Sequence, residues 1–309
     1  MVIYILLLLT IGLAVLSLYL LWSGGAKPLN SGWHKMLCGL SLSVFIYLYG
    51  TWVYLTINAK FLFGIIALLF IIGSLFRPKK NIQRTPALWR MISNLLFTCL
   101  FTVLTILYFT GTMGSNPKKA AMAFPLKTGR YFVLQGGKGL PTNLFHYSLR
   151  GAVFAMDIVK LNSWGGRANR IFSSRLEDYE IFNDTLYSPV SGRVIRAYGD
   201  NPDNIPPNME RGPNNTNQVL LETDSFYVFL AHMKKESVIV KEGQWVKQGE
   251  ALGCVGNSGF SSEPHLHIQV HAKKPGVPWY AGEPLYIQFS GKSYLLYEVI
   301  RPKRVKMVQ

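Results

Sequence analysis

The chain has 309 residues, of which 49% are hydrophobic and 16% are charged, compared with about 25% charged residues in an average soluble domain. Its 32 Lys and Arg residues outnumber its 16 Asp and Glu residues, which gives a formal net charge of +16. These values exclude a wholly soluble protein and an intrinsically disordered chain, and three cysteines are too few for a disulfide scaffold.

The acidic residues divide the chain into two parts. Residues 1–114 contain no Asp or Glu and eight Lys or Arg residues, whereas residues 115–309 contain all 16 acidic residues. The first part is too apolar to be dissolved in water, while the second has the composition of an ordinary soluble domain. We therefore expect a membrane domain over residues 1–114, followed by a separate domain over residues 115–309.

Four apolar segments predict four transmembrane helices. Val2–Trp22, Met36–Ile57 and Met91–Met113 lack charged residues over 21 to 23 positions. A helix of 21 residues is about 31 Å long, enough to cross a hydrocarbon core of about 30 Å. Phe61–Phe76 has 16 residues, so it requires local thinning of the bilayer or snorkelling of the flanking basic residues. A cleaved signal peptide is the alternative for the first segment, but that segment lacks a basic start and its apolar run is too long.

Basic residues in the short loops predict the orientation in the membrane. With the first and third loops in the cytoplasm, seven basic residues lie inside and one outside, so the N-terminus and everything after Met113 lie outside. No charged residue falls within a predicted span, which gives no indication of an ion path or a proton relay. The loop residues are Lys27 and Lys35 in the first loop, Lys60 in the second, and Arg77, Lys79, Lys80, Arg84 and Arg90 in the third.

From about Ser115 the chain changes to short alternating runs separated by Gly, Pro and Asn. Such runs, rich in β-branched and aromatic residues, are typical of strands, and no helical period of useful length is present. We therefore predict an all-β domain with turns spaced as in a sandwich or barrel. The predicted strands are Tyr131–Leu134, Val153–Val159, Arg193–Ala197, Gln218–Glu222, Tyr227–His232 and His265–Val270.

Histidines carry the chemical signal of this domain, which contains five of the six in the chain. His265 and His267 are two residues apart in a predicted strand, so their side chains share a face. Asp157 lies in a second predicted strand, on the face of Val153, Ala155 and Val159, where a carboxylate needs a partner. Because Zn²⁺ accepts imidazole nitrogen and carboxylate oxygen, this combination indicates a metal site.

At this point the chain resembles a known family, the lysostaphin/LytM-type zinc metalloendopeptidases that cut peptidoglycan peptides. The resemblance runs from about Gln135 to His271, and its motifs follow one another in the family's order. The membrane part lies outside it. The motifs are Ala155–Asp157, Tyr187–Val194, Leu230–Met233, Val240–Gly249, Gly253–Gly259 and Pro264–His267.

The resemblance implies the roles of five residues. His146, Asp157 and His267 would hold one Zn²⁺, and His232 and His265 would flank the attacking water and the scissile carbonyl. Zinc activates water and polarises a carbonyl, and imidazole can move protons near neutral pH.

The resemblance also implies a fold, a substrate and a location. The fold would be an antiparallel β-sheet with a split-barrel core of the lysostaphin (duplicated hybrid motif) type, centred on about residues 131–288. The substrate would be peptidoglycan peptides, and the protein would be a multi-pass protein of the bacterial cytoplasmic membrane with its catalytic domain extracytoplasmic.

The spacing of the first two ligands departs from the family pattern. Many members have His-x-x-x-Asp, whereas His146 precedes Asp157 by eleven positions. Segment Tyr147–Met156 is expected to form a hairpin with its turn near Leu149–Gly151, which would bring both side chains to one face. If His146 is not the ligand, His271 or a residue near Asn143 is the candidate. His271 is otherwise expected to lie behind the ligands or at the surface.

Three classes of function remain open from the sequence. The leading hypothesis is a membrane-anchored zinc endopeptidase, and all five residues that it needs are present. The alternatives are a catalytically silent binding or regulatory domain on the same anchor, and a sensor or channel whose spans carry the function. The net charge of +8 on residues 115–309 suits an anionic wall or membrane surface, although a solvated basic surface with no partner fits equally well. No nucleic acid is expected as a partner, and a protein partner is unknown.

Overall fold

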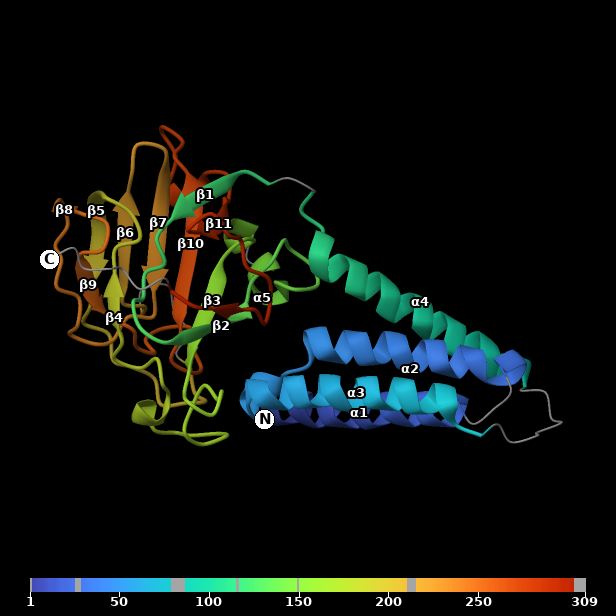
Figure 1. The fold of residues 1–309 in the computed structure, drawn as a ribbon. Helices are drawn as coiled ribbons and strands as arrows, with labels where there is room; N and C mark the ends of the chain where they lie inside the picture. The colour runs from blue at the N-terminus through green and yellow to red at the C-terminus, as the bar shows by residue number, and fades with distance from the viewer. Residues whose placement is uncertain are drawn as a thin grey trace, which may run out of the picture. The chain divides into compact units, whose positions relative to one another are not determined.

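The computed structural model describes residues 2–25, 29–78, 87–114, 117–148, 150–209 and 215–302. The chain forms two compact units (Figure 1). One comprises Met1–Phe109 with Trp164–Gly166, and the other comprises Thr110–Ser163 with Arg167–Gln309.

The first unit is helical. Among the described residues it contains four long helices and a short 3₁₀ turn, η1. Their bounds are α1 (Val2–Gly25), α2 (Leu29–Tyr49), η1 (Trp52–Tyr54), α3 (Ile57–Phe76) and α4 (Leu88–Thr110).

Three of these helices, within the described parts of the chain, are long and apolar enough to cross a membrane. They are Ile3–Gly25 of α1, Ile57–Phe76 of α3 and Leu88–Thr110 of α4. Helix α2 carries His34 and Lys35 in its first turns, which makes it less apolar. The predicted count of four spans is therefore not confirmed, whereas an apolar helical region before the β-domain is.

Helix α3 differs from its predicted segment. It begins at Ile57, four residues before Phe61, because Thr56 accepts a hydrogen bond from the Asn58 backbone N–H and caps the helix. With 20 residues α3 is about 30 Å long, so no bilayer thinning is needed. Lys60 consequently lies inside the helix, buried, with its Nζ 4.9 Å from the centre of the Tyr47 ring. The expectation that the spans contain no charged residue is therefore wrong for α3.

Several of the loop residues that predict the orientation lie outside the described residues. These are Lys27, Lys79, Lys80 and Arg84. The orientation therefore stays a prediction.

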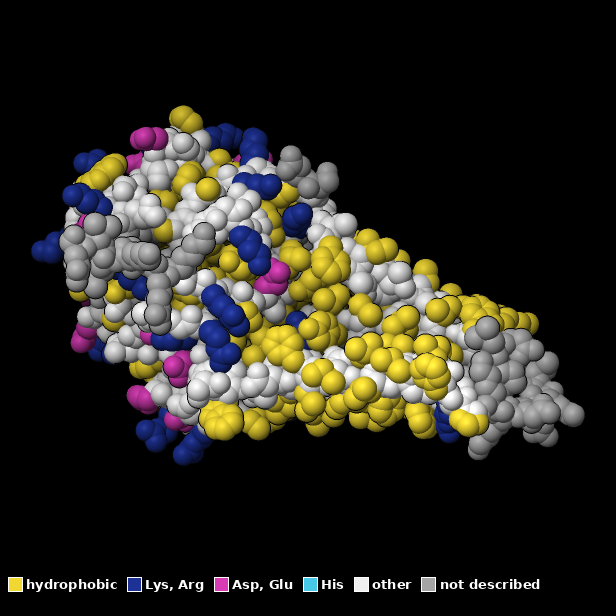
Figure 2. Space-filling view, in the orientation of Figure 1, with side chains coloured by type: hydrophobic (Ala, Val, Ile, Leu, Met, Phe, Trp, Pro, Cys, Tyr) yellow, Lys and Arg dark blue, Asp and Glu magenta, His cyan; other side chains and the backbone are white. Residues whose placement is uncertain are grey.

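The helical unit packs through small residues and exposes apolar ones. A Cβ on Gly39 of α2 would lie 2.8 Å from the Leu21 backbone nitrogen, so the two backbones approach closely only because Gly39 has no side chain. The outer faces of the helices are covered with apolar side chains (Figure 2). Such faces suit a hydrocarbon environment and not water.

The second unit is built on an antiparallel sheet with two smaller strand pairs. Its described residues give an eight-stranded sheet in the order β12-β2-β3-β10-β7-β6-β5-β8, a parallel pair β1-β11 and an antiparallel pair β4-β9. The strands are β1 (Lys119–Met122), β2 (Arg130–Gln135), β3 (Met156–Leu161), β4 (Thr185–Tyr187), β5 (Gly192–Tyr198), β6 (Gln218–Glu222), β7 (Phe226–Ala231), β8 (Trp245–Val246), β9 (Ala251–Cys254), β10 (Leu266–Ala272), β11 (Tyr286–Phe289) and β12 (Val299–Ile300).

All six predicted strands are present, and a mostly antiparallel β-domain is confirmed. The main boundary error is in β3, which begins at Met156 and not at Val153. The domain is also not purely β, because its described residues include the short helix α5 (Leu144–Tyr147) and several 3₁₀ turns. The 3₁₀ turns are η2 (Arg150–Ala152), η3 (Leu176–Asp178) and η4 (Trp279–Ala281).

Strand β10 has one face in the core and the opposite face in the candidate site. Leu266, Ile268 and Val270 belong to the main hydrophobic cluster. His267 and Gln269 alternate with them and therefore lie on the other face, as the two-residue period of a strand requires. Buried apolar side chains thus fix the strand from one side and present the histidine on the other.

Candidate metal centre

The register of three central strands brings the functional side chains together. On β10, His267 lies directly opposite Asp157 of β3 on one side and Ala231 of β7 on the other. His232 follows Ala231 directly, and His265 directly precedes β10. Residues more than a hundred positions apart in the sequence are therefore neighbours because of strand pairing.

His146 comes from the short helix α5, and the predicted hairpin over Tyr147–Met156 is wrong. The segment contains the end of α5 and the 3₁₀ turn η2, followed by β3. The Tyr147 backbone N–H donates to the Asn143 oxygen at 2.9 Å, which closes a helical turn instead of a strand ladder. The His146 side chain therefore reaches the site from a helix, and not from a strand of a hairpin.

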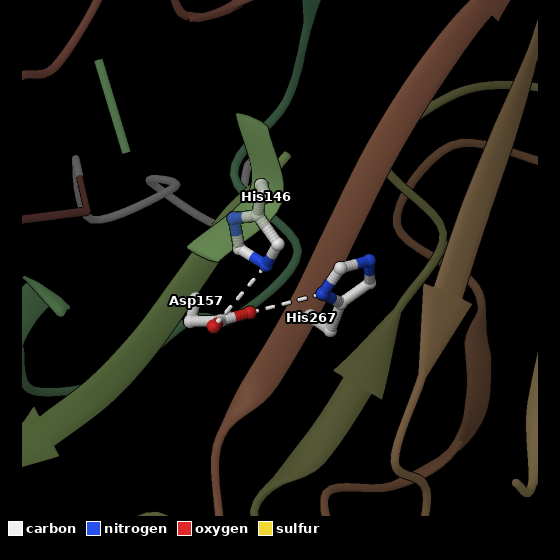
Figure 3. A group of neighbouring side chains, drawn as sticks. All are labelled: His146, Asp157 and His267. Carbon is white, nitrogen blue, oxygen red and sulfur yellow. Dashed lines mark hydrogen bonds and ion pairs between the residues drawn. The ribbon is translucent and has the colours of Figure 1, made fainter. Parts of the chain in front are cut away.

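Two imidazoles approach the Asp157 carboxylate from different elements (Figure 3). His146 Nε2 lies 3.3 Å from Asp157 Oδ2, and His267 Nδ1 lies 2.9 Å from Asp157 Oδ1. One nitrogen of each histidine and one carboxylate oxygen lie within 4.8 Å of one another. All three side chains are largely buried.

The other two predicted residues border this group. His265 Nε2 lies 3.4 Å from Asp157 Oδ1, so His265 and His267 share a face as expected. The centre of the His232 ring lies 4.7 Å from that of His265 and 5.6 Å from that of His267. His232 has φ of 60°, in the left-handed region that non-glycine residues seldom adopt. Local backbone strain of this kind is concentrated at functional sites.

Hydrogen bonds on the outer side of each ring settle which nitrogen is free. His232 and His265 direct Nδ1 at the backbone oxygens of Ser258 and Glu263, both at 2.8 Å. Since a carbonyl can only accept, each Nδ1 carries a proton and each Nε2 faces the site. His267 places Nε2 3.1 Å from the Gln269 side-chain oxygen, which leaves Nδ1 toward Asp157.

Burial and mutual attraction also set the charges of the site. Burial opposes ionisation of Asp157, but attraction from the His146 and His265 imidazoles outweighs it and holds the pKa of the carboxyl well below its usual range. Burial lowers the pKa of His267 and, with repulsion from neighbouring histidines, lowers the pKa of His232 well below its usual range. Burial also opposes charge on His265, but the Asp157 carboxylate outweighs it and raises that pKa.

His271 is not at the surface, and it is not among the group that could hold a metal. Its side chain is fully buried, its Nδ1 donates to the Gly282 oxygen at 3.1 Å, and its ring packs against Trp279. The group that could hold a metal comprises His146, Asp157 and His267, so the structure gives no support for His271 as a third ligand.

Sequence reasoning missed the residues that hold the histidines in place. Asn143 Oδ1 lies 2.9 Å from His146 Nδ1. Asn143 precedes His146 by one helical turn, so this contact could be predicted only if helix α5 were predicted first. Glu263, whose backbone oxygen binds His265, is fixed by a buried ion pair to Arg167 at 2.8 Å. No local pattern signals that pair, because 96 positions separate its members.

The donor set fits a zinc ion. Zinc bonds of about 2.0–2.2 Å to nitrogen and oxygen place tetrahedral ligand atoms about 3.3 Å apart. The contacts of Asp157 with His146, at 3.3 Å, and with His267, at 2.9 Å, are close to this separation. Two imidazoles and one carboxylate are a ligand combination of catalytic zinc sites, which leave a coordination position open.

Comparison with known proteins identifies a family over part of the chain. Residues 178–278 match Peptidase family M23. This segment contains His232, His265 and His267, whereas His146 and Asp157 precede it. The resemblance stated from the sequence motifs is thereby confirmed for the second half of the site.

A second similarity, over a short segment, is to a curated protein. An "Uncharacterized metalloprotease" of Haemophilus influenzae is 36% identical over 75 residues, which are 22% of this chain and 15% of that protein. The match thus spans a small part of the relative's length.

Among solved structures, the catalytic domain of lysostaphin from Staphylococcus simulans is 16% identical with a TM-score of 0.28, over 53% of this chain and 86% of that one. The catalytic domain of a prophage-encoded protein of the same peptidase family from Enterococcus faecalis is 18% identical with a TM-score of 0.32, over 52% of this chain and 93% of that one. A zinc-containing peptidase from Vibrio cholerae is 17% identical with a TM-score of 0.29, over 54% of this chain and 39% of that one. These structural matches are weak, and the family assignment comes from the sequence match.

Proposed function

We propose that this chain, which carries a domain of Peptidase family M23 over residues 178–278, is a membrane-anchored zinc metalloendopeptidase that hydrolyses peptide bonds of peptidoglycan. The observation that carries the proposal is the convergence of His146, Asp157 and His267, with His232 and His265 beside them. A structural role alone would not require five ionisable side chains to be buried around one point.

In this proposal His146 Nε2, Asp157 and His267 Nδ1 would hold Zn²⁺. When bound, the ion supplies a Lewis acid that polarises the scissile carbonyl and lowers the pKa of water. The Asp157 carboxylate is ionised, and Asn143 and Gln269 occupy the outer nitrogens of His146 and His267, so that the inner nitrogens are the ones available to a metal.

His232 and His265 would move the protons of the reaction. Each holds its Nδ1 proton on a backbone carbonyl and keeps Nε2 free on the site side. A free Nε2 can take a proton from the attacking water and, once protonated, can donate a hydrogen bond to the developing oxyanion or a proton to the leaving amine. The fixed backbone carbonyls keep both rings oriented during these transfers.

The apolar helices support attachment to a membrane, and the basic residues of the loops support a location of the β-domain outside the cytoplasm. Peptidoglycan lies on that side of a bacterial membrane, which is consistent with the proposed substrate. The net charge of +8 on residues 115–309 favours encounter with an anionic wall.

Digestion of purified peptidoglycan by the full-length protein in detergent tests the proposal. We expect new amino groups and soluble peptides to be released by the zinc-loaded wild type, and none after chelation or with His146→Ala or Asp157→Ala. Those two variants should also lose zinc. Binding of zinc and of wall without release of peptides would contradict the proposal and favour the catalytically silent domain.

A further inference from the structure

Asn143 has an unusual set of contacts at the start of α5. Its side chain is fully buried, and it occupies the N-cap position of the helix. An N-cap asparagine usually accepts a hydrogen bond from a backbone N–H of the first turn, but within the described residues Asn143 makes no such bond. Its amide instead donates to the oxygens of Val153 at 3.0 Å and Ala155 at 2.9 Å, while Oδ1 lies 2.9 Å from His146 Nδ1.

These contacts fix the orientation of the amide. The Val153 and Ala155 oxygens can only accept, so the amino group of Asn143 must point to them and Oδ1 must point to His146. His146 Nδ1 therefore carries the ring proton and donates it to Asn143. The other nitrogen, Nε2, faces Asp157 at 3.3 Å and is the one available to a metal.

The same contacts connect the two ligand-bearing segments. Val153 and Ala155 belong to the stretch that leads into β3, and Asp157 follows Ala155 by two positions. Asn143 and His146 lie one helical turn apart on the other segment. One buried side chain thus holds α5 against the entrance of β3, across the eleven positions between His146 and Asp157.

We propose that Asn143 is a positioning residue of the metal centre, which fixes the Nδ1–H tautomer and the direction of His146 and ties α5 to β3. The inference rests on the proposed function only in taking His146 as a metal ligand. Asn143 itself is not a ligand, because its oxygen is occupied by His146 Nδ1 and its amino group by two carbonyls. Residues behind a ligating histidine typically contribute 10- to 100-fold to metal affinity.

The test uses full-length protein in detergent, labelled with ¹⁵N at histidine, together with zinc affinity measured by chelator competition. The His146 resonances are assigned by their loss in His146→Gln. In metal-free wild type we expect His146 to show a protonated Nδ1. Asn143→Ala should remove this tautomer preference and weaken zinc binding 10- to 100-fold.

Two further variants separate the roles of Asn143. Asn143→Asp keeps an acceptor for Nδ1–H but sets a carboxylate against two carbonyl oxygens, so it should restore the tautomer while lowering thermal stability. Thr142→Val removes a different buried polar group of the same loop, whose Oγ1 donates to the Gly139 oxygen, and it should leave tautomer and zinc affinity unchanged.

Unchanged tautomer and unchanged zinc affinity in Asn143→Ala would overturn the inference. The tautomer is read without metal and without substrate, so it decides the role of Asn143 even if the wild type fails to digest peptidoglycan. Zinc binding without wall hydrolysis would contradict the proposed function and leave the inference standing.

Discussion

At the scale of single residues, the site depends on which ring nitrogen of each histidine is free. Four imidazoles surround Asp157, and an acceptor on the outer side of each ring binds one nitrogen: two backbone carbonyls and two side-chain amides. This arrangement directs the other nitrogen of each ring toward the same region around the carboxylate.

Replacement of His232 and His265, the histidines proposed to transfer protons, should separate chemistry from metal binding. His265→Ala and His232→Asn should each reduce peptidoglycan hydrolysis by 10²- to 10⁴-fold while zinc content stays at the wild-type level. Asn is chosen at position 232 because it tolerates the left-handed backbone, φ 60°, that Ala would strain. Activity and bound zinc are measured on the same samples, and loss of zinc in either variant would show that a ligand has been misassigned.

The buried pair of Arg167 and Glu263 should matter for stability. Glu263→Gln leaves the Arg167 guanidinium buried without its carboxylate, and breaking such a pair costs about 3–5 kcal/mol. Urea unfolding should show this loss. The double variant Arg167→Met with Glu263→Leu removes both charges and should recover most of the stability; a single variant as stable as the wild type would contradict the argument.

At the scale of elements, the position of His146 depends on a single short helix. Helix α5 spans four residues, too few to be stable alone, so the buried contacts of Asn143 must hold it. This would account for the separation of eleven positions between the first two proposed ligands.

Loss of the helical turn should therefore act like loss of the ligand. Tyr147→Pro removes the N–H that donates to the Asn143 oxygen and disfavours helical backbone at His146, so zinc affinity should fall by at least tenfold. Tyr147→Ala keeps the N–H and removes an exposed side chain, and it should bind zinc as the wild type does. Equal affinity of the Pro and Ala variants would contradict a role for this turn.

At the scale of the whole molecule, the predicted orientation can be tested directly. Loop basic residues predict that everything after Met113 lies outside the cytoplasm. A phosphatase reporter fused at Gln309, which is active only outside, should be active, and a fluorescent reporter that matures only in the cytoplasm should be dark. The reverse result would contradict both the orientation and the wall substrate.

Alkaline pH should destabilise the β-domain. Burial raises the pKa of Tyr179, Tyr286 and Tyr297 to about 12, with nearby acidic residues adding to the effect for Tyr179 and Tyr286. Stability from these groups is complete below pH 10 and is lost between about pH 10 and 12, because the unfolded chain releases the protons first. Each tyrosine contributes a slope of about 1.4 kcal/mol per pH unit in that window.

Urea midpoints at pH 8, 10 and 11 measure this loss. Tyr297→Phe removes one ionisable group while keeping the ring that stacks on Phe132, so its midpoint should fall less steeply. A wild-type midpoint that does not change up to pH 11 would contradict the prediction.

The apolar helical region, the strands and the candidate residues could all be predicted from the sequence. Long uncharged runs and two-residue alternation are local patterns, so they could be read without knowledge of contacts. The position of His265 and His267 on one face of a strand also follows from such a local pattern. The sequence could not set the limits of α3, because Lys60 lies inside the helix, buried against Tyr47.

The path by which His146 reaches Asp157, and the contacts that hold each imidazole in place, depend on the folded chain and could not be predicted. The residue pattern of segment Tyr147–Met156 does not distinguish a hairpin from a helical turn. The buried amide of Asn143 favours the helical turn through its hydrogen bonds to the Val153 and Ala155 oxygens. The direct pairing of His267 with Asp157 comes from the register of β3 and β10, which are separated by more than a hundred residues. Such contacts depend on side-chain packing between distant segments, so they cannot be predicted from local sequence patterns.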